Sequence, residues 1–471
     1  MNCQDRRESA MGFLPDERKL KKYISGGEFG LEKESLRVDQ HGYLSHTPHP
    51  FPDDSRIDRD FCENQVELIT GVNDSIEDVW SELAGLYRET ADRLLELETG
   101  REYLWPFSNP PYVRGEADIP IANFTGRQAG KGVYREYLAG KYGKRKMLYS
   151  GIHYNFSFPE DLLREDFACR GKKKAVIETE RNLVSNDKRE KADSREKNCA
   201  AGEKEQEFRE YKDQIYLELG KKAVKYSWLI VYLTAASPVL DGSYYRVGDL
   251  DETVVSRYAS PRCSEIGYWN SFVPILDFSS LDAYADSIDG YVKNRMITAS
   301  TELYYPVRLK ARGENTTDNL RKNGVSHVEL RMLDLNPLCP VGIRRQDLRF
   351  IHLLLVWLML QEDEMLGTME QNIAIRNMKE AARFSPDEIQ IEFGWHQSRS
   401  VREAAAEILD AMEETLPEYF AGQEDVVREC LAFQREKVED PSKRYAAQVR
   451  ERFQKGYVKK GIRLAEGYCH V

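Results

Sequence analysis

Four segments of the chain alternate apolar and polar residues in the way that predicts β-strands, whose successive side chains point to opposite faces. They are FGLEKESLRVD (Phe29–Asp39), NQVELIT (Asn64–Thr70), SGIHYNFSF (Ser150–Phe158) and HVELRMLDL (His327–Leu335). Long segments with helical patterns separate them, and the chain has no internal repeat. We therefore expect strands and helices to alternate irregularly along the chain.

Helical patterns lie between and after these strands. In the segment Asp74–Glu98 the apolar residues recur at helical spacing, and Ser75 followed by Asp78 forms a capping-box variant at its start. The segment YLELGKKAVKYSWLIVYLTAA is also predicted to be helical and ends before Pro238. The apolar run FIHLLLVWLML (Phe350–Leu360) is shorter than the roughly 20 residues of a membrane-spanning helix. It predicts a helix buried in the core.

Two stretches lack such a pattern. Residues 170–210 are almost wholly charged or polar, which is typical of a solvated loop or of a frayed helix extension. GRQAGKG (Gly126–Gly132) looks like a phosphate-binding loop, but that motif has four residues before Gly-Lys and then Ser or Thr. Here three residues intervene and Gly132 follows the lysine. A glycine-rich turn is predicted instead.

The composition narrows the class of protein. Of the 471 residues, 41% are hydrophobic and 31% are charged, with a net charge of −11, which argues against a surface that binds a nucleic-acid backbone. The eight cysteines include no CxxC pair, so neither a zinc module nor a disulfide framework is indicated. The first residues contain no apolar segment of signal-peptide length. We expect a cytoplasmic protein without membrane contact.

The predicted strands share an unusual polar face. Glu32 and Glu34 stand two residues apart on the first strand, so their carboxylates point to the same side and repel each other. The polar residues on or just before the other strands are Asp60, Gln65 and Glu67, then His153, Asn155 and Ser157, then Glu329 and Arg331. A single strand of this kind would be an ordinary solvent-facing one. Four strands that repeat glutamate, histidine and arginine indicate a functional surface.

The residue types on this face point to metal and phosphate chemistry. Carboxylates and an imidazole are ligands that Mg²⁺ or Mn²⁺ accepts, and a divalent cation would compensate the paired glutamates. An arginine beside such ions is suited to stabilising phosphate oxygens during transfer. The sequence therefore predicts a metal-dependent enzyme that handles phosphorylated or highly anionic ligands on an open sheet face.

Seven motifs in order carry a family resemblance: GLEKESLRV, DFCENQVELITGV, LWPFSNPPYV, YREYLAGKYG, SGIHYNFSFP, ELYYPVRLKAR and VELRMLDLNPLCPVGI. Together they resemble bacterial glutamate–cysteine ligase and the ligase half of bifunctional glutathione-synthesising enzymes. The resemblance implies an α+β fold like that of glutamine synthetase, with a curved antiparallel sheet that forms a funnel-shaped active site and is backed by helices. It also implies one catalytic module over residues 1–471. Residues 170–210 are a charged insert without a counterpart, and residues 344–471 are a helix-rich part of that module.

The resemblance implies a reaction as well. L-glutamate, L-cysteine and ATP would give γ-glutamylcysteine, ADP and phosphate through γ-glutamyl phosphate, with Mg²⁺, or Mn²⁺ in its place. The expected partners are these small molecules alone, and the expected assembly is a monomer or homodimer. The chain ends near where a fused second ligase would begin, so we expect glutathione synthesis to need another enzyme or to stop at γ-glutamylcysteine.

The family's site residues carry over by position. The metal-binding positions match Glu32, Glu34, Asp60, Glu67, His153 and Glu329, and Arg331 matches the arginine that stabilises the transferring phosphoryl group. The substrate-binding positions match Phe61, Tyr134, Arg135, Arg262, Tyr268 and Tyr304. We interpret His352 and Cys62 as packing residues, Glu63 as a hydrogen-bonding partner behind the site, and Lys131 as a surface lysine.

Three alternatives stay open. A related ligase that joins glutamate to another amine would share the metal and phosphate residues and differ only in the acceptor pocket. A two-metal hydrolase of phosphate esters also needs paired carboxylates and an arginine, but it would not need an amine for ADP release. A non-catalytic amino-acid sensor would be expected to have lost some of the charged residues.

Overall fold

A seven-stranded antiparallel sheet forms the centre of the computed structural model, which describes residues 20–124, 129–171, 196–362, 365–394 and 397–469. The strands run in the order β2-β3-β1-β5-β9-β8, and β4 pairs with β1. Their bounds are Glu28–Asp39 (β1), Ile57–Arg59 (β2), Gln65–Ile69 (β3), Glu102–Leu104 (β4), Gly151–Ser157 (β5), Val307–Lys310 (β8) and His327–Asp334 (β9). The four strands predicted from the sequence are β3, β1, β5 and β9, which are consecutive neighbours. The expected mixed architecture with an antiparallel sheet is confirmed.

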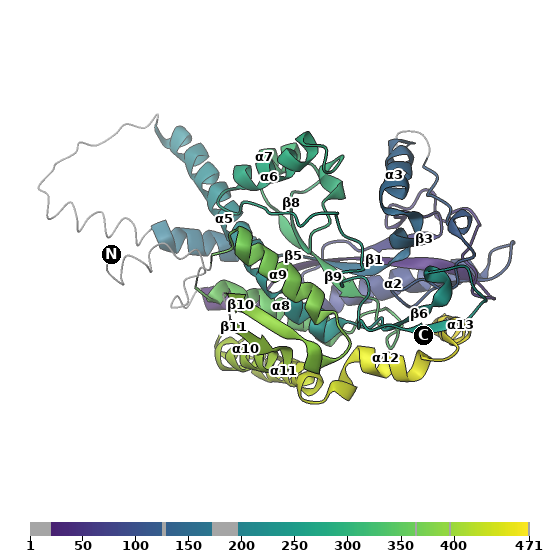
Figure 1. Ribbon diagram of the computed structural model, residues 1–471. Coiled ribbons are helices and arrows are strands. Elements are labelled where there is room, and N and C mark those ends of the chain that lie inside the picture. The colour runs from purple at the N-terminus through teal and green to yellow at the C-terminus, as the bar shows by residue number, and fades with distance from the viewer. Residues whose placement is uncertain (1–19, 125–128, 172–195, 363–364, 395–396, 470–471) are drawn as a thin grey trace, which may run out of the picture.

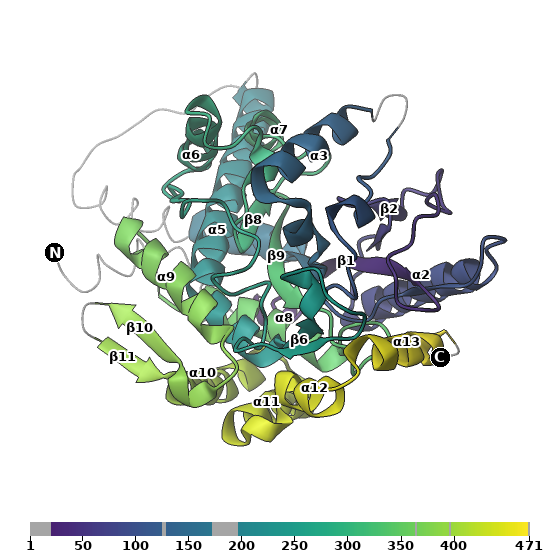
Figure 2. The same cartoon turned by 45° about the vertical axis from the view of Figure 1, so that its right-hand side comes forward.

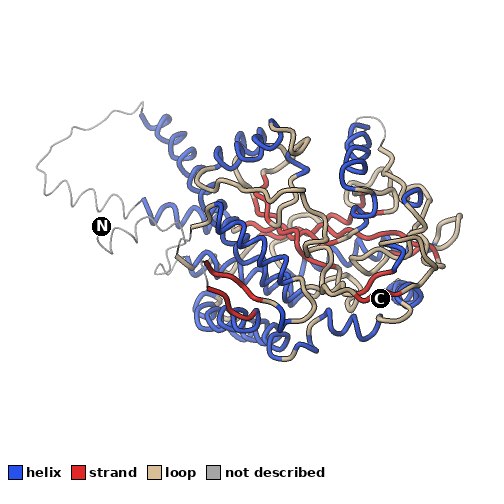
Figure 3. The backbone as a smooth tube through the Cα atoms, viewed as in Figure 1, coloured by secondary structure: helices blue, strands red, loops and turns tan. Residues whose placement is uncertain are grey.

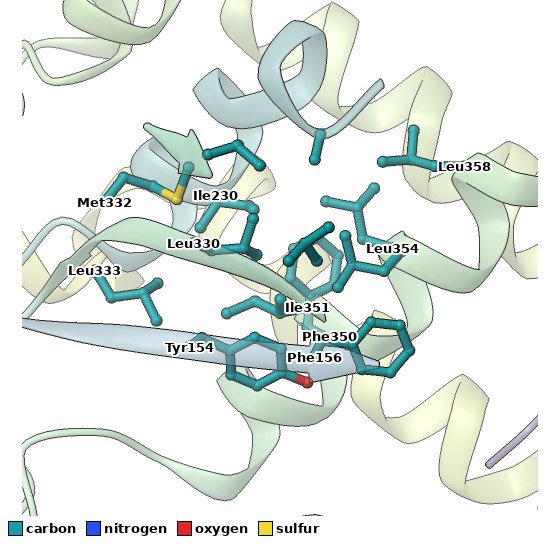
Figure 4. Close-up of a cluster of buried hydrophobic side chains, with 14 of the residues drawn as sticks. Tyr154, Phe156, Ile230, Leu330, Met332, Leu333, Phe350, Ile351, Leu354 and Leu358 are labelled. Atoms are coloured by element: carbon teal, nitrogen blue, oxygen red, sulfur yellow. The ribbon is translucent and has the colours of Figure 1, made fainter. Parts of the chain in front are cut away.

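The apolar face of this sheet packs on helices. Tyr154 and Phe156 of β5 and Leu330 of β9 lie against side chains of α5 (Glu196–Thr234) and α8 (Arg345–Leu360), as Figure 4 shows. The helix predicted over Phe350–Leu360 is therefore a core helix. No helix among the described residues is long and apolar enough to cross a membrane.

Helices surround the sheet, as the tube in Figure 3 shows. In Figures 1 and 2, α3 (Ala129–Tyr142), α6 (Leu281–Lys293) and α7 (Thr317–Asn323) lie above the sheet, whereas α8 and the helices α10 to α13 lie below it. The other helices are α2 (Ile76–Leu95), α9 (Thr368–Ala381), α10 (Val401–Thr415), α11 (Glu424–Glu439), α12 (Tyr445–Phe453) and α13 (Tyr457–Tyr468). The predicted cap of α2 forms, since the Ser75 hydroxyl accepts a hydrogen bond from the Asp78 amide.

Short elements complete the fold. Two-stranded ribbons pair β6 (Val239–Asp241) with β7 (Thr253–Val255) and β10 (Gln390–Gly394) with β11 (Gln397–Ser400). Turns of 3₁₀ helix lie at Leu20–Lys22, Glu116–Asp118, Lys144–Leu148, Gly242–Tyr244, Ser300–Glu302, Pro386–Glu388, Leu416–Tyr419 and Pro441–Lys443.

A buried ion pair joins the C-terminal helices to the core. Lys437 of α11 lies 2.9 Å from the Asp347 carboxylate of α8, and both side chains are almost fully buried. The Tyr445 hydroxyl of α12 donates to the other oxygen of Asp347 at 2.7 Å. Since unpaired buried charges are costly, this network fixes three helices relative to one another.

The structure corrects one prediction and leaves another partly outside the described residues. Residues 129–132 of the glycine-rich segment form the first turn of α3, so the predicted turn is wrong there, while residues 126–128 are not described. Tyr134 and Leu138, one helical turn apart and both facing the cavity described below, account for the helix. Within the charged stretch 170–210, residues 172–195 are not described, and α5 begins at Glu196. The part from Glu196 onward agrees with a helix extension.

Candidate active site

Two glutamates and one histidine, each from a different strand, lie close together on the polar face of the sheet. Nδ1 of His153 (β5) lies 3.0 Å from Oε2 of Glu32 (β1) and 3.9 Å from Oε1 of Glu329 (β9). The ligand atoms of these three residues all lie within 4.8 Å of one another. The β5–β9 pairing shifts register between Ile152 and Tyr154, so His153 lies at an irregularity of the ladder.

Glu34 and Glu67 extend this cluster toward the other edge of the sheet. Glu34 is buried, accepts a hydrogen bond from the Gly151 amide at 2.9 Å and lies 3.8 Å from Nε2 of His153. Burial and the charge of Asp60 raise the pKa of Glu34. Burial and the carboxylates of Asp60, Glu32 and Glu34 raise the pKa of Glu67. Among the described residues, the Glu67 side chain has no hydrogen bond or ion pair.

Glu32 and Glu329 have partners instead. Although burial opposes ionisation, the hydrogen bond with His153 lowers the pKa of Glu32, and the Asn155 amide donates to its other oxygen at 3.1 Å. Glu329 lies 3.3 Å from Nζ of Lys310 and 3.6 Å from Nη1 of Arg331. Against the effect of burial, these cations hold the pKa of Glu329 well below its usual range.

A cavity of about 550 Å³ opens over this face. Its lining includes all six residues expected to bind substrates, which are Phe61, Tyr134, Arg135, Arg262, Tyr268 and Tyr304. It also includes Glu34, Asp60, His153 and Arg331. Glu32, Glu67 and Glu329 are not among the lining residues. The carboxylate–histidine cluster and the cavity are therefore adjacent and share Glu34 and His153.

Two walls of the cavity come from segments distant in sequence. Tyr134 and Arg135 extend from α3, and Arg135 contacts the Asp60 carbonyl. In another part of the lining the hydroxyls of Tyr268 and Tyr304 contact each other. These side chains give the cavity an aromatic and cationic boundary.

Arg262 also lines the cavity, but some of its guanidinium N–H groups already donate hydrogen bonds to backbone carbonyls. Its guanidinium donates to the carbonyls of Arg331 at 2.6 Å and Leu333 at 3.3 Å. It lies directly over Gly151, where a Cβ atom would stand 2.3 Å from Nη2 of Arg262. Only glycine permits this close approach.

The donor set fits a divalent cation. The two carboxylates of Glu32 and Glu329 and the imidazole of His153 are within reach of one ion, and such oxygen and nitrogen donors suit Mg²⁺ or Mn²⁺. Oε2 of Glu329 is buried without a hydrogen-bond partner, a state that costs free energy unless another group satisfies it. The raised pKa of Glu67 points the same way, because a cation would relieve the repulsion from its neighbours.

Lys310, a cation close to the site, was not predicted from the sequence. Lys310 lies on the four-residue strand β8, where it shares a face with Arg308; the alternation in PVRLKAR was the available signal. Lys131 is exposed, as expected for a surface lysine, and it also lines the cavity, 3.6 Å from the Asp58 carboxylate. The packing interpretations agree with the structure, since His352 and Cys62 are buried.

Glu63 also lies where it was expected, behind the site. It accepts hydrogen bonds from the amides of His49 and Asn123 and pairs with Arg59 at 3.3 Å.

Comparisons with known proteins give one consistent family. The sequence matches the family described as glutamate-cysteine ligase over residues 14–188, 195–299 and 291–381. It is 35% identical over 461 residues to the bifunctional glutathione biosynthesis protein of Listeria innocua, covering 95% of this chain and 55% of that protein. It is 30% identical over 413 residues to the glutamate–cysteine ligase of Clostridium acetobutylicum, covering 78% of each.

Solved structures share the fold. The bifunctional glutathione synthetase of Pasteurella multocida superposes with a TM-score of 0.74 at 27% identity, over 96% of this chain and 53% of that one. The glutamate–cysteine ligase of Francisella tularensis superposes with a TM-score of 0.77 at 22% identity, over 94% and 88%. The chain thus spans about half the length of the bifunctional relatives it matches. From the family match and these identities, the chain belongs to the glutamate–cysteine ligase family.

Proposed function

We propose that this protein joins the γ-carboxylate of L-glutamate to the amine of L-cysteine at the expense of ATP, giving γ-glutamylcysteine, ADP and phosphate. The observation that carries the proposal is the adjacency of the Glu32–His153–Glu329 cluster and Arg331 to a cavity lined by the expected substrate-binding side chains. Family membership supports the same reaction. In this proposal the product enters glutathione biosynthesis.

The first step transfers a phosphoryl group. A γ-carboxylate oxygen of glutamate attacks the γ-phosphorus of ATP, the bond to the bridging oxygen breaks, and ADP leaves. Glu32, Glu34, Asp60, Glu67, His153 and Glu329 would hold Mg²⁺, or Mn²⁺ in its place, which supplies positive charge to the phosphate oxygens. Arg331, held beside Glu329, stabilises the charge on the phosphoryl group as it moves.

The second step forms the amide. The cysteine amine attacks the carbonyl carbon of γ-glutamyl phosphate, phosphate leaves with the former carboxylate oxygen, and the nitrogen loses a proton. Tyr268, Tyr304 and Phe61 bound the cavity and provide a wall for a small acceptor side chain. Arg135 and Arg262 provide charge for substrate carboxylates.

The finer features of the fold belong to the same proposal. We propose that the cavity over the polar face is the funnel of a glutamine-synthetase-like site, and that residues 1–471 form one catalytic module in which residues 344–471 are the helix-rich C-terminal part. The continuous hydrophobic cluster from the sheet through α8 to α11 supports a single module. The proposed assembly is a monomer or homodimer.

The test is ADP release by the purified protein with Mg²⁺, ATP and L-glutamate. L-cysteine, 2-aminobutyrate and no acceptor are compared, and products are identified by mass spectrometry. We expect a γ-glutamyl dipeptide formed best with cysteine. Faster formation with another amine would favour the related ligase, and ADP release that is independent of any amine would favour the hydrolase. A lack of release under all conditions would favour the sensor.

A further inference from the structure

A buried carboxylate stands behind the aromatic wall of the cavity without lining it. Glu302 is fully buried at the end of the 3₁₀ turn Ser300–Glu302. Its Oε1 accepts hydrogen bonds from Nζ of Lys141 at 2.5 Å and from the Tyr142 hydroxyl at 2.7 Å. Its Oε2 accepts from the Thr298 amide at 2.6 Å. The charge is therefore fully satisfied, as a buried ion requires.

Two of the three donors to Glu302, the Lys141 ammonium and the Tyr142 hydroxyl, come from the last two residues of α3. The same helix carries Tyr134 and Arg135 into the cavity. Lys141 also donates to the Met296 carbonyl at 2.8 Å, and the Thr301 hydroxyl donates to Tyr134 at 3.3 Å. The segment 296–302 thus contacts α3 at several points, and Glu302 provides the charged group among these contacts.

The Tyr142 ring connects this attachment to Tyr268 and Tyr304, which line the cavity. It packs edge-on against Tyr268, with centroids 5.6 Å apart, and against Tyr304, with centroids 5.5 Å apart. Edge-to-face pairs of this kind have a defined geometry. Tyr142 itself is not among the lining residues, so it acts behind the wall.

Asn270 closes the arrangement. Its side-chain amide donates to the Tyr142 hydroxyl at 3.1 Å and to the Glu302 carbonyl at 2.9 Å, and its oxygen accepts from the Tyr304 amide at 2.8 Å. Glu302, Lys141, Tyr142 and Asn270 form what we call the Glu302 clasp. Through it, the end of α3 and the Tyr268–Tyr304 wall are fixed by one carboxylate.

We propose that Glu302 is a positioning residue for the acceptor amino acid, because the Glu302 clasp fixes α3, which carries Tyr134 and Arg135, against the Tyr268–Tyr304 pair, and these four side chains line the cavity that would hold the acceptor. This inference rests on the proposed ligase function. It assigns specificity to a residue that contacts no substrate. The residues assigned to the phosphoryl-transfer step make no hydrogen bond to the clasp among the described residues. They are Glu32, Glu34, Asp60, Glu67, His153, Glu329 and Arg331.

The test compares Glu302→Gln with the wild type in two measurements. In steady-state kinetics with Mg²⁺, we expect the KM for L-cysteine to rise about tenfold, as for the loss of a hydrogen bond to a charged group, while the KM for ATP changes less than about twofold. In hydrogen–deuterium exchange without ligands, we expect faster exchange in the peptide that covers residues 129–142. Tyr142→Phe keeps the ring and removes one donor, so its effects should be smaller in the same direction.

Asp241→Asn is the matched control. Asp241 is a buried carboxylate that accepts from the Ser243 amide and lies outside the cavity lining, so both KM values should stay at the wild-type level. Equal rises of the KM for cysteine and for ATP in Glu302→Gln, or unchanged exchange in α3, would overturn the inference alone. A wild-type protein that releases no ADP in response to any amine would overturn the proposed function and the acceptor role with it.

Discussion

Glu34 of β1 lies directly opposite Glu67 of β3 in the antiparallel ladder. The two carboxylates therefore share one face of the sheet, and Glu32 lies on the same face beside His153. The chain compensates these charges unequally. Glu32 has His153 and Asn155, and Glu34 has an amide, whereas the Glu67 side chain has no hydrogen bond or ion pair among the described residues, and the nearby carboxylates of Asp60, Glu32 and Glu34 raise its pKa. This imbalance makes Glu67 the most informative position for a metal test.

Glu67→Gln should abolish Mg²⁺-dependent turnover, because the carboxylate is lost as a ligand and an amide oxygen binds such ions more weakly. Without metal, the same change should leave the melting temperature unchanged or raise it, since a repelled carboxylate is neutralised. Kinetics with varied Mg²⁺ and thermal melts check both parts. Glu407→Gln, at an exposed glutamate of α10, is the control. Near-normal turnover of Glu67→Gln would contradict the ligand assignment.

Arg331→Ala should reduce kcat about 10²- to 10³-fold with a smaller effect on ATP binding, because the interaction is strongest when charge shifts in the transition state. The lost partner also leaves Glu329 with less cationic charge, although Lys310 stays 3.3 Å away. Turnover and equilibrium ATP binding are measured separately. If the two fall by the same factor, Arg331 is a binding residue only.

Gly151→Ala should disturb the site through Arg262. The added Cβ atom would stand 2.3 Å from the guanidinium, which must then leave the carbonyls of Arg331 and Leu333. We expect turnover to fall at least tenfold and stability to decrease by about 1–3 kcal/mol from overpacking.

Gly85→Ala is the matched control for this change. Gly85 lies inside α2 with open space at its Cβ position, so alanine there should stabilise the protein by roughly 0.5–1 kcal/mol. Urea unfolding and turnover of both variants check the pair. Full activity in Gly151→Ala would show that the position of Arg262 is not critical.

The polar face could be predicted from sequence because a strand has a period of two. Glu32 with Glu34 and Glu329 with Arg331 share a face whatever strands lie beside them. Their convergence on His153 depends on strand order, which the local pattern does not contain. The short strand β8 gave too few residues for its alternation to be recognised, so Lys310 was missed.

The Glu302 clasp also could not be predicted from the sequence, because its residues lie far apart in the chain. Glu302 lies 161 positions from Lys141 and 160 from Tyr142, and each residue alone is an ordinary charged or aromatic one. The glycine-rich segment shows another limit, since helical packing of Tyr134 and Leu138 overrides the low helix propensity of Gly130 and Gly132. Local propensity fails where tertiary contacts supply the larger free energy.

His352 should make the protein sensitive to acid. Its ring packs edge-on against Phe29, with centroids 5.1 Å apart, and Nε2 lies 3.3 Å from the Gly26 carbonyl. Burial lowers the pKa of His352 to about 4, below the value of about 6.5 in an unfolded chain. The unfolded state therefore binds the proton first, so this contribution to stability is fully present above about pH 6.5 and is lost as the pH falls toward 4. The loss can reach about 3 kcal/mol.

The measurement is urea unfolding of the wild type and His352→Gln at pH 7.5 and pH 5.5. Glutamine can keep a donor near Gly26 and does not titrate, so the variant should be less stable at pH 7.5 but lose less stability on acidification. At pH 5.5, one unit below the unfolded pKa, the difference in acid-induced loss should be about 1.4 kcal/mol. Carboxylates titrate equally in both proteins and cancel in this comparison. Parallel losses in the two proteins would mean that His352 titrates normally and that its burial does not exclude the proton.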